Sequence, residues 1–400
     1  MSPFDERLKL AEELMINFAH STGLTLNAPQ DRYLWTDAFA VFNYTYLYVH
    51  TKKPMFRELA LLLIDAVHQV LGKHRGDDGR SGWISGLSEE EAREHPTISG
   101  LRIGKRLPER RPDEPYDPVL EWERDGQYYH YLTKWMLALC RVFQVTGNAK
   151  YLRWGLELAK TAHKAFVCTS PIDKRKHIYW KMSIDLTRPL VFGEGQHDAL
   201  DGLSTYLELH SIAKKSSLNA LSLESEIHDL YEMCKESDWS DWVTEDPLGI
   251  GELLCIAHRL ARVHNEVLDV SSIMDAVLEA AYVSLRAFFP KNLIYAPASS
   301  RLAFRELGLV IGLRAAEKLE GEAQGISASS QVIRRILEFR ALAEKILEFW
   351  LKKENRETLT WLKHHNINMV MLTTSLVPEG YLGLSKEGQV SANEPSRPSN

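Results

Sequence analysis

The strongest constraint on the fold of this chain is an alternation between helices that are apolar on every side and helices that are apolar on one side only. Residues 32–50 are the first of the wholly apolar kind, because large side chains such as Trp35 and Phe39 recur at helical spacing and small or apolar residues fill the remaining faces. A helix without a polar face is buried on both sides. Its charged residues, Arg32 and Asp37, fall in the first two turns, so functional groups are expected at its N-terminal end.

The same pattern recurs along the chain. We expect buried helices near residues 33–50, 127–146, 197–213, 247–262, 301–316 and 365–377, with amphipathic helices between them. Helical hairpins of this kind pack well when the apolar helices form an inner ring that the amphipathic helices cover. The sequence therefore predicts an all-α fold, an (α/α)6 toroid of six helical hairpins. We expect a single domain over residues 1–384 and a disordered tail over residues 385–400, which lack apolar periodicity.

Two long segments interrupt the helical pattern. Residues 76–126 form a long irregular insertion, and a loop of this length in a compact domain is usually functional or disordered. Residues 167–192 include the alternating stretch HIYWKMSID, which predicts a short strand or hairpin. Both segments connect an outer helix to an inner one, and such connections share one rim of the toroid. We therefore expect the pocket at the rim formed by the N-terminal ends of the inner helices.

Composition excludes several classes of function. A formal net charge of -6 argues against a nucleic-acid or anionic-membrane surface, since both usually need a basic stripe. The four cysteines are far apart, and neighbouring histidine and acidic residues on a helix point in different directions, so we expect no metal and no cofactor. The first ten residues lack the apolar core of a signal peptide, which predicts a cytoplasmic protein. A small-molecule or oligosaccharide substrate fits this composition, and the oligomeric state is left open.

The whole pattern resembles the six-hairpin, (α/α)6-barrel superfamily of glycosidases, glycan lyases and sugar epimerases. Residues 33–39, YLWTDAF, are similar to the Trp-x-Asp-aromatic openings of inner helices in unsaturated-glucuronyl-type hydrolases. Residues 196–199, QHDA, are similar to the Gly-His-Asp/Glu opening of an inner helix in acylglucosamine and cellobiose epimerases. His365 opens the last inner helix, where the resemblance implies another catalytic histidine. The resemblance implies a sugar substrate and a pocket at the rim.

The candidate catalytic residues are Glu194, His197, Asp198 and Asp37. The first three form a dense ionisable cluster at the start of an inner helix, and capping of that helix is the alternative explanation. Inverting glycosidases need two carboxyl groups, one to protonate the leaving oxygen and one to activate water. Asp201, one turn after His197, is expected to orient that imidazole.

The candidate substrate-binding residues are polar or aromatic groups near the same rim: Arg32, Trp35, Trp83, Glu121, Tyr128, His130, Lys134, Arg301 and His365. Sugars stack on aromatic faces and accept hydrogen bonds from charged side chains. A lysine on an otherwise apolar helix needs a carboxylate partner, and Asp37 or Glu194 is expected to serve Lys134. Core packing beneath an ordered loop is the alternative for the aromatic residues.

Three functions follow from these observations. The first is a glycoside hydrolase with paired carboxyl groups drawn from Glu194, Asp198, Asp37 and Glu121. The second is a sugar epimerase or isomerase in which His197 and His365 carry protons. The third is a non-catalytic binding or scaffold protein. We further predict that one shared pocket collects Arg32, Asp37, His130, Lys134, Glu194, His197 and His365.

Overall fold

The structure is a computed structural model that describes residues 3–25, 31–216, 221–264, 266–289, 295–322 and 329–384. The expected disordered tail, residues 385–400, lies outside the described residues. Among the helices that are described, none combines the length and the apolar character needed to cross a membrane.

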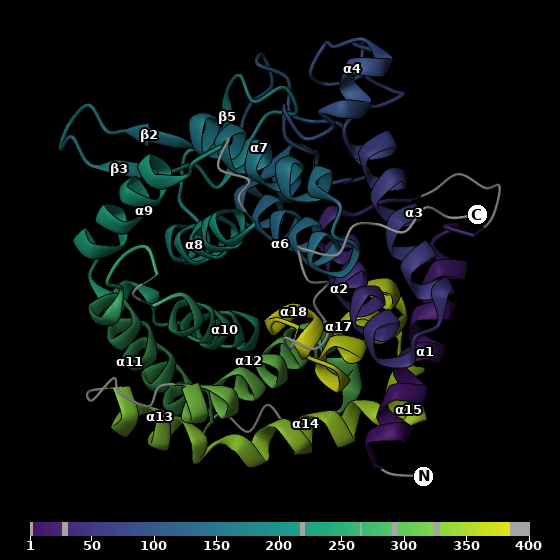
Figure 1. Cartoon of the computed structure of the whole chain (residues 1–400), viewed down its shortest axis with the longest axis vertical. Coiled ribbons are helices and arrows are strands. Elements are labelled where there is room, and N and C mark those ends of the chain that lie inside the picture. Colours follow the sequence, from purple (N-terminus) through teal and green to yellow (C-terminus); the bar gives the residue numbers. More distant parts are fainter. Residues whose placement is uncertain are drawn as a thin grey trace.

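Six helices form the inner ring of the fold (Figure 1). They are α2 (Leu34–Thr51), α6 (Tyr129–Thr146), α8 (Asp198–Lys215), α10 (Pro247–Val263), α12 (Ala303–Glu322) and α17 (His365–Leu376). Each of these helices contacts the next along the chain, and α17 contacts α2, which closes the ring. The predicted (α/α)6 arrangement is confirmed, and the helix boundaries agree with the predicted ones to within two residues, except that α12 continues six residues beyond its predicted end at residue 316.

The outer layer consists of amphipathic helices that each cover an inner one. They are α1 (Pro3–Ser21), α3 (Pro54–Leu71), α7 (Ala149–Phe166), α9 (Glu224–Glu236), α11 (Ser271–Phe288), α13 (Ser329–Leu337) and α14 (Arg340–Leu351). The amphipathic helix expected between residues 316 and 365 is divided into two helices, α13 and α14. The sixth hairpin joins the two ends of the chain, because α1 packs against α17.

Local sequence explains where these helices begin and end. The Asn148 side chain accepts a hydrogen bond from the Lys150 backbone N–H at the start of α7. Asp246 caps α10 in the same way, and Pro247 occupies the first helical position, where its missing N–H costs nothing. Gly147 ends α6 with φ 69°, a left-handed conformation that glycine adopts without strain.

The two long connecting segments lie at the rim formed by the N-terminal ends of the inner helices. They contain α4 (Glu89–Glu94), α5 (Pro118–Glu123) and the strands β2 (Val167–Thr169), β3 (Lys176–Ile178), β4 (Lys181–Met182) and β5 (Pro189–Val191). Strand β1 (Gln127–Tyr128) directly follows the first segment. β2 and β3 form the predicted hairpin, and a second antiparallel sheet has the order β1-β4-β5. Arg80 joins the two segments through an ion pair with Asp185 at 2.7 Å.

Several short helices complete the fold. They are the 3-10 turns η1 (Trp239–Trp242) and η4 (Ala298–Ser300), and the helices α15 (Lys353–Arg356), α16 (Leu359–Lys363) and α18 (Glu379–Leu382). α18 lies inside the ring, in contact with α2, α6, α10 and α17 (Figure 1). Arg141 and Arg262, from the C-terminal halves of α6 and α10, donate hydrogen bonds to the backbone carbonyls of α18. The end of the ring opposite the rim is therefore filled by protein.

Candidate functional site

Lys134 on α6 is the centre of a buried ion-pair cluster that crosses the inner ring. Its Nζ lies 2.8 Å from Asp201 Oδ1 of α8 and 2.8 Å from Glu252 Oε1 of α10, and its side chain is only 2% exposed. Lys134 meets carboxylates as predicted, but the expected partners, Asp37 and Glu194, are wrong. The partners come from the two inner helices that follow α6 around the ring, at the same depth as Lys134.

The two carboxylates bound to Lys134 have pKa values displaced in opposite directions. Burial acts to raise the pKa of Asp201, but the positive charges of Lys134 and Arg259 outweigh it and hold the pKa below its usual value. Burial raises the pKa of Glu252, Lys134 opposes this, and the nearby Asp201 charge adds to the rise. Titratable pairs whose environments push their pKa values apart are typical of acid–base sites.

Glu252 is also the more accessible member of the pair. Its side chain is 21% exposed, whereas that of Asp201 is 2% exposed and also accepts a hydrogen bond from Thr133. Only Oε1 of Glu252 has a hydrogen-bond partner among the described residues. The second carboxyl oxygen is therefore free to exchange a proton with a bound molecule.

His130 and Asp198 form a second pair beside this cluster. His130 Nδ1 lies 3.5 Å from Asp198 Oδ1, and the imidazole is 31% exposed. His130 Nδ1 and Asp198 Oδ2 are buried atoms without a hydrogen-bond partner among the described residues. A buried polar atom without a partner costs free energy, so this pair is an unusual feature of the interior. We call His130, Lys134, Asp198, Asp201 and Glu252 the rim cluster.

A row of four aromatic rings leads from the surface to the rim cluster. Trp122 stacks on Trp180 with 5.4 Å between ring centroids, Trp180 stacks on Tyr128 at 5.0 Å, and Tyr128 stacks on His130 at 5.4 Å. Trp122, at the outer end, is exposed. The predicted residue Tyr128 is buried within this row.

The starts of the remaining inner helices complete the rim. The hydroxyls of Tyr33, just before α2, and Tyr131, on α6, are 2.7 Å apart. Arg305 of α12 pairs with Asp246, the N-cap residue of α10. Burial lowers the pKa of His364, which precedes α17, and the positive charge of Arg305 lowers it further. Burial raises the pKa of Tyr131 well above its usual value, and Arg305 opposes that rise. All six inner helices therefore contribute a polar group at or near their N-terminal ends.

Two of the predicted catalytic residues at the start of α8 point away from the rim cluster. Glu194 is 51% exposed and contacts His177 in strand β3. His197 Nε2 lies 2.8 Å from the Trp242 carbonyl oxygen, and burial lowers the pKa of its imidazole. Asp201 does not orient His197, as its side chain contacts Thr133 and Lys134 instead.

Arg32 and Asp37 form a buried ion pair at the start of α2. Their side chains are buried, with Arg32 Nη1 3.6 Å from Asp37 Oδ1, and Arg32 also donates to the Thr22 carbonyl oxygen at 2.6 Å. Asp37 Oδ2 accepts a hydrogen bond from the Tyr33 backbone N–H. Burial raises the pKa of Asp37 to about 6, although Arg32 opposes the rise. Trp35 packs on Phe39 at 4.3 Å between ring centroids.

Three of the predicted binding residues stabilise rim segments or the outer layer. Glu121 pairs with Lys181 at 2.9 Å and with Arg110 at 2.8 Å, so both carboxyl oxygens are used. The Trp83 indole donates to Glu89 at 2.7 Å. Arg301 pairs with Glu306 at 2.6 Å and lies over the Phe349 ring.

His365 lies apart from the other predicted site residues. It lines a pocket between α1 and the segment α15–α17, outside the inner ring. The prediction that seven residues share one pocket is therefore wrong as stated. Of the predicted residues, Tyr128, His130, Lys134 and Asp198 lie together.

Sequence reasoning missed Glu252, Tyr131 and Arg305. Glu252 had a signal, because it is the only acidic residue between 247 and 263 and lies within two turns of the start of an inner helix. The same rule identified Lys134, whose carboxylate partner had to come from another inner helix. Arg305 is equally close to the start of α12.

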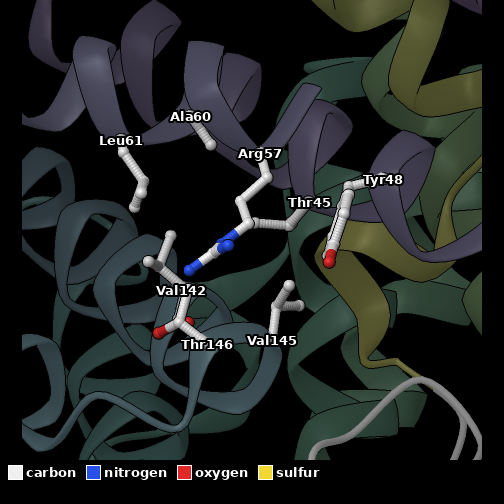
Figure 2. Close-up of a pocket in the computed structure, with 8 residues that line it drawn as sticks. All are labelled: Thr45, Tyr48, Arg57, Ala60, Leu61, Val142, Val145 and Thr146. Carbon is white, nitrogen blue, oxygen red and sulfur yellow. The ribbon is translucent and has the colours of Figure 1, made fainter. Parts of the chain in front are cut away.

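Another hollow lies between α2, α3 and α6, far from the rim (Figure 2). Its lining includes Thr45, Val142 and Val145, which belong to the C-terminal halves of α2 and α6, and the guanidinium of Arg57 extends into it. The space is too narrow for a water molecule, so we do not consider it a ligand site. Within the described ranges, no group of three or more His, Cys, Asp or Glu side chains is arranged to hold a metal ion.

Comparison with known proteins identifies the fold. No protein-family profile and no curated protein matches this chain by sequence. Its structure aligns with a D-mannose isomerase with a TM-score of 0.54 and 12% identity, covering 94% of this chain and 99% of the isomerase. It also aligns with the GH76 α-mannanase of Bacteroides thetaiotaomicron, with a TM-score of 0.53, 10% identity and coverage of 92% and 95%.

A cellobiose 2-epimerase from Bacillus thermoamylovorans B4167 aligns with a TM-score of 0.51 and 10% identity, over 92% of this chain and 98% of the epimerase. The alignments extend over almost the whole length of each protein, so the likeness concerns the complete toroid. Identities of 10–12% establish the fold and leave the activity to be argued from the residues of this chain. The chain has the six-hairpin (α/α)6 fold of this mannose isomerase, this mannanase and this epimerase, as the sequence resemblance predicted.

Proposed function

We propose that this protein is a carbohydrate-active enzyme that uses acid–base chemistry at the rim cluster. The observation that carries the proposal is Glu252, an accessible carboxyl group with a raised pKa that Lys134 holds in place. Fixed, partly desolvated carboxyl groups of this kind serve as general acids near neutral pH. The fold shared with a mannose isomerase, a mannanase and a cellobiose epimerase supports a sugar as substrate.

Our first candidate reaction is glycoside hydrolysis. Glu252 would protonate the leaving glycosidic oxygen, and Asp198 on the neighbouring helix α8 would act as the second carboxyl group. Asp198 is retained from the sequence prediction, whereas Glu252 takes the role expected for Glu194. Asp37 and Glu121 are less suitable, because both are held in buried ion pairs.

The second candidate is epimerisation or isomerisation of a sugar, which the contact between His130 and Asp198 favours. A carboxylate beside an imidazole orients the ring, so His130 would be positioned to remove a proton from the carbon next to a carbonyl. Glu252 would then protonate the carbonyl oxygen. In this reaction His130 takes the role that the sequence had suggested for His197 and His365.

Product analysis on a panel of sugars and oligosaccharides distinguishes the two reactions. Hydrolysis releases a new reducing end, whereas epimerisation or isomerisation in deuterated water incorporates deuterium into the sugar without cleavage. The key variant is Glu252→Gln, which keeps the shape of the side chain and removes its ionisable carboxyl proton. We expect kcat to fall about 10²- to 10⁴-fold with a small change in KM.

Glu194→Gln is the matched control, because it makes the same chemical change on an exposed glutamate of the rim. We expect its kcat and KM to stay within about twofold of wild type, the usual outcome for a surface substitution. Full activity of the Glu252→Gln variant would refute the assignment of Glu252. Binding of sugars without turnover by the wild type would favour the third function, a binding protein.

A further inference from the structure

The pocket that contains His365 lies outside the inner ring, between α1 and the segment α15–α17. Its volume is about 490 Å³, within the range of small-molecule sites. It is lined by Leu14, Asn17, His20, Ser21, Lys353, Arg356, Glu357, Trp361, His365 and Met369. His365, which the sequence had assigned to the catalytic pocket, belongs to this one.

The pocket gathers basic side chains from three different helices. Lys353 and Arg356 come from α15, and His20 and His365 come from α1 and α17. Glu357 is the one acidic residue in the lining. Its contact with Lys353 is 3.6 Å long and highly exposed, so that ion pair contributes little.

Arg356 has unused capacity for hydrogen bonding. Its Nε atom is buried and has no hydrogen-bond partner among the described residues. Its Nη2 donates to the Leu351 carbonyl oxygen at 3.3 Å, and no carboxylate of the described residues pairs with the guanidinium. Nη1 is not buried and has no hydrogen-bond partner among the described residues, so it can donate to a ligand oxygen in the pocket.

The floor of the pocket is apolar. Leu14, Trp361 and Met369 line it and are almost fully buried in the protein. A pocket with a cationic wall and an apolar floor suits a ligand that carries both an anionic and an organic part. An inorganic ion would contact the cationic wall but make no contact with the apolar residues of the floor.

We propose that this pocket binds a small phosphorylated organic molecule, such as a sugar phosphate, separately from the substrate of the rim cluster. The phosphoryl group would accept hydrogen bonds from Arg356 and Lys353, and the organic part would lie over Leu14 and Trp361. A planar guanidinium matches the spacing of phosphate oxygens. A phosphate dianion carries two negative charges, which the two side chains can balance, whereas a carboxylate carries only one.

Calorimetric titration of the full chain with glucose 6-phosphate, inorganic phosphate and glucose tests the proposal. We expect glucose 6-phosphate to bind most tightly, inorganic phosphate more weakly and glucose not at all. Arg356→Gln and Lys353→Gln should each weaken glucose 6-phosphate binding about tenfold or more. Lys353 is 80% exposed, so the second variant removes the charge with little effect on the fold.

Lys352→Gln is the matched control, because Lys352 is adjacent in sequence and does not line the pocket. It should bind glucose 6-phosphate as the wild type does. Equal binding by the Lys352 and Lys353 variants, or equal affinity for glucose and glucose 6-phosphate, would refute the proposal. The Glu252→Gln variant should keep wild-type affinity, so this test is independent of the proposed catalytic function.

Discussion

Replacement of Lys134 by methionine tests whether the rim cluster is held together by one buried positive charge. Methionine has nearly the length of lysine, so the change removes charge and hydrogen bonds with little change in packing. In the wild type, Lys134 Nζ lies 2.8 Å from each of two carboxylate oxygens and is almost inaccessible to solvent. Its loss leaves Asp201 and Glu252 facing each other without their shared partner.

The expected cost follows from these contacts. Breaking a buried ion pair by removing one partner usually destabilises a protein by about 3–5 kcal/mol. Two features moderate the cost here. Asp201 keeps a second positive charge nearby, since Arg259 Nη1 is 3.7 Å away, and Glu252 can take up a proton. We therefore expect the free energy of unfolding to fall by about 3 kcal/mol near pH 8, the lower end of that range.

The same reasoning predicts how the loss depends on pH. Without Lys134, the pKa of Glu252 in the folded state rises further above its unfolded value. A carboxyl group of this kind stabilises the folded state below its unfolded pKa, and that contribution is lost as pH rises through the folded pKa. The destabilisation caused by Lys134→Met should therefore be smaller at pH 5 than at pH 8.

Urea unfolding followed by tryptophan fluorescence measures this free energy, and Lys164→Met serves as a control on the exposed face of α7. The control should change stability by less than about 0.5 kcal/mol. Adding Glu252→Gln to Lys134→Met should recover about 1 kcal/mol or more, because it removes one unpaired charge. A cost for Lys134→Met equal to that of the control, or no recovery in the double variant, would refute this account.

Two further predictions concern the inner helices. Asp37 has a pKa raised from 3.8 to about 6, so its ionisation should lower the free energy of unfolding of the wild type by about 2 kcal/mol as pH rises from 4 to 8. Urea titrations across this range should show Asp37→Asn gaining stability relative to wild type, and parallel curves would contradict this. At Gly251, a Cβ atom would lie 2.1 Å from the Gly308 carbonyl oxygen, whereas at Gly76 it meets nothing within 4 Å. Thermal unfolding should therefore show Gly251→Ala less stable by about 1–3 kcal/mol and Gly76→Ala unchanged, and equal melting temperatures would show that α10 and α12 can separate at no cost.

The fold was largely predictable because it depends on patterns within single helices. The wholly apolar run at residues 32–50 and its five counterparts each show in their own sequence that they are buried. The cap and proline at Asp246 and Pro247 fixed the start of α10 in the same local way. The division of the outer helix into α13 and α14 was not predicted, because the apolar residues of 333–351 continue across the break.

The candidate site was only partly predictable, because its chemistry depends on pairs between helices that are distant in sequence. Lys134 and Asp201 are 67 residues apart, and Lys134 and Glu252 are 118 apart. The sequence indicates that each polar side chain lies near the start of an inner helix, but it does not give the rotation of the helix about its axis. That rotation turns His130 toward Asp198, and it turns His365 outward toward α1.

The rotation of the inner helices about their axes also places charged side chains inside the ring, so the interior is more polar than the sequence suggested. Arg141 and Glu208, deep in α6 and α8, form a buried ion pair at 2.8 Å, and Arg259 of α10 lies 3.3 Å from Glu208. Arg259 also lies near Asp201 and donates to the Tyr381 hydroxyl of α18. Buried charges are tolerated only when they are paired, so each charged residue inside the ring fixes the rotation of its helix against the next. The network thus extends from α18 at the closed end to Glu252 at the rim, and it holds the proposed acid in a fixed position against helices that are otherwise apolar.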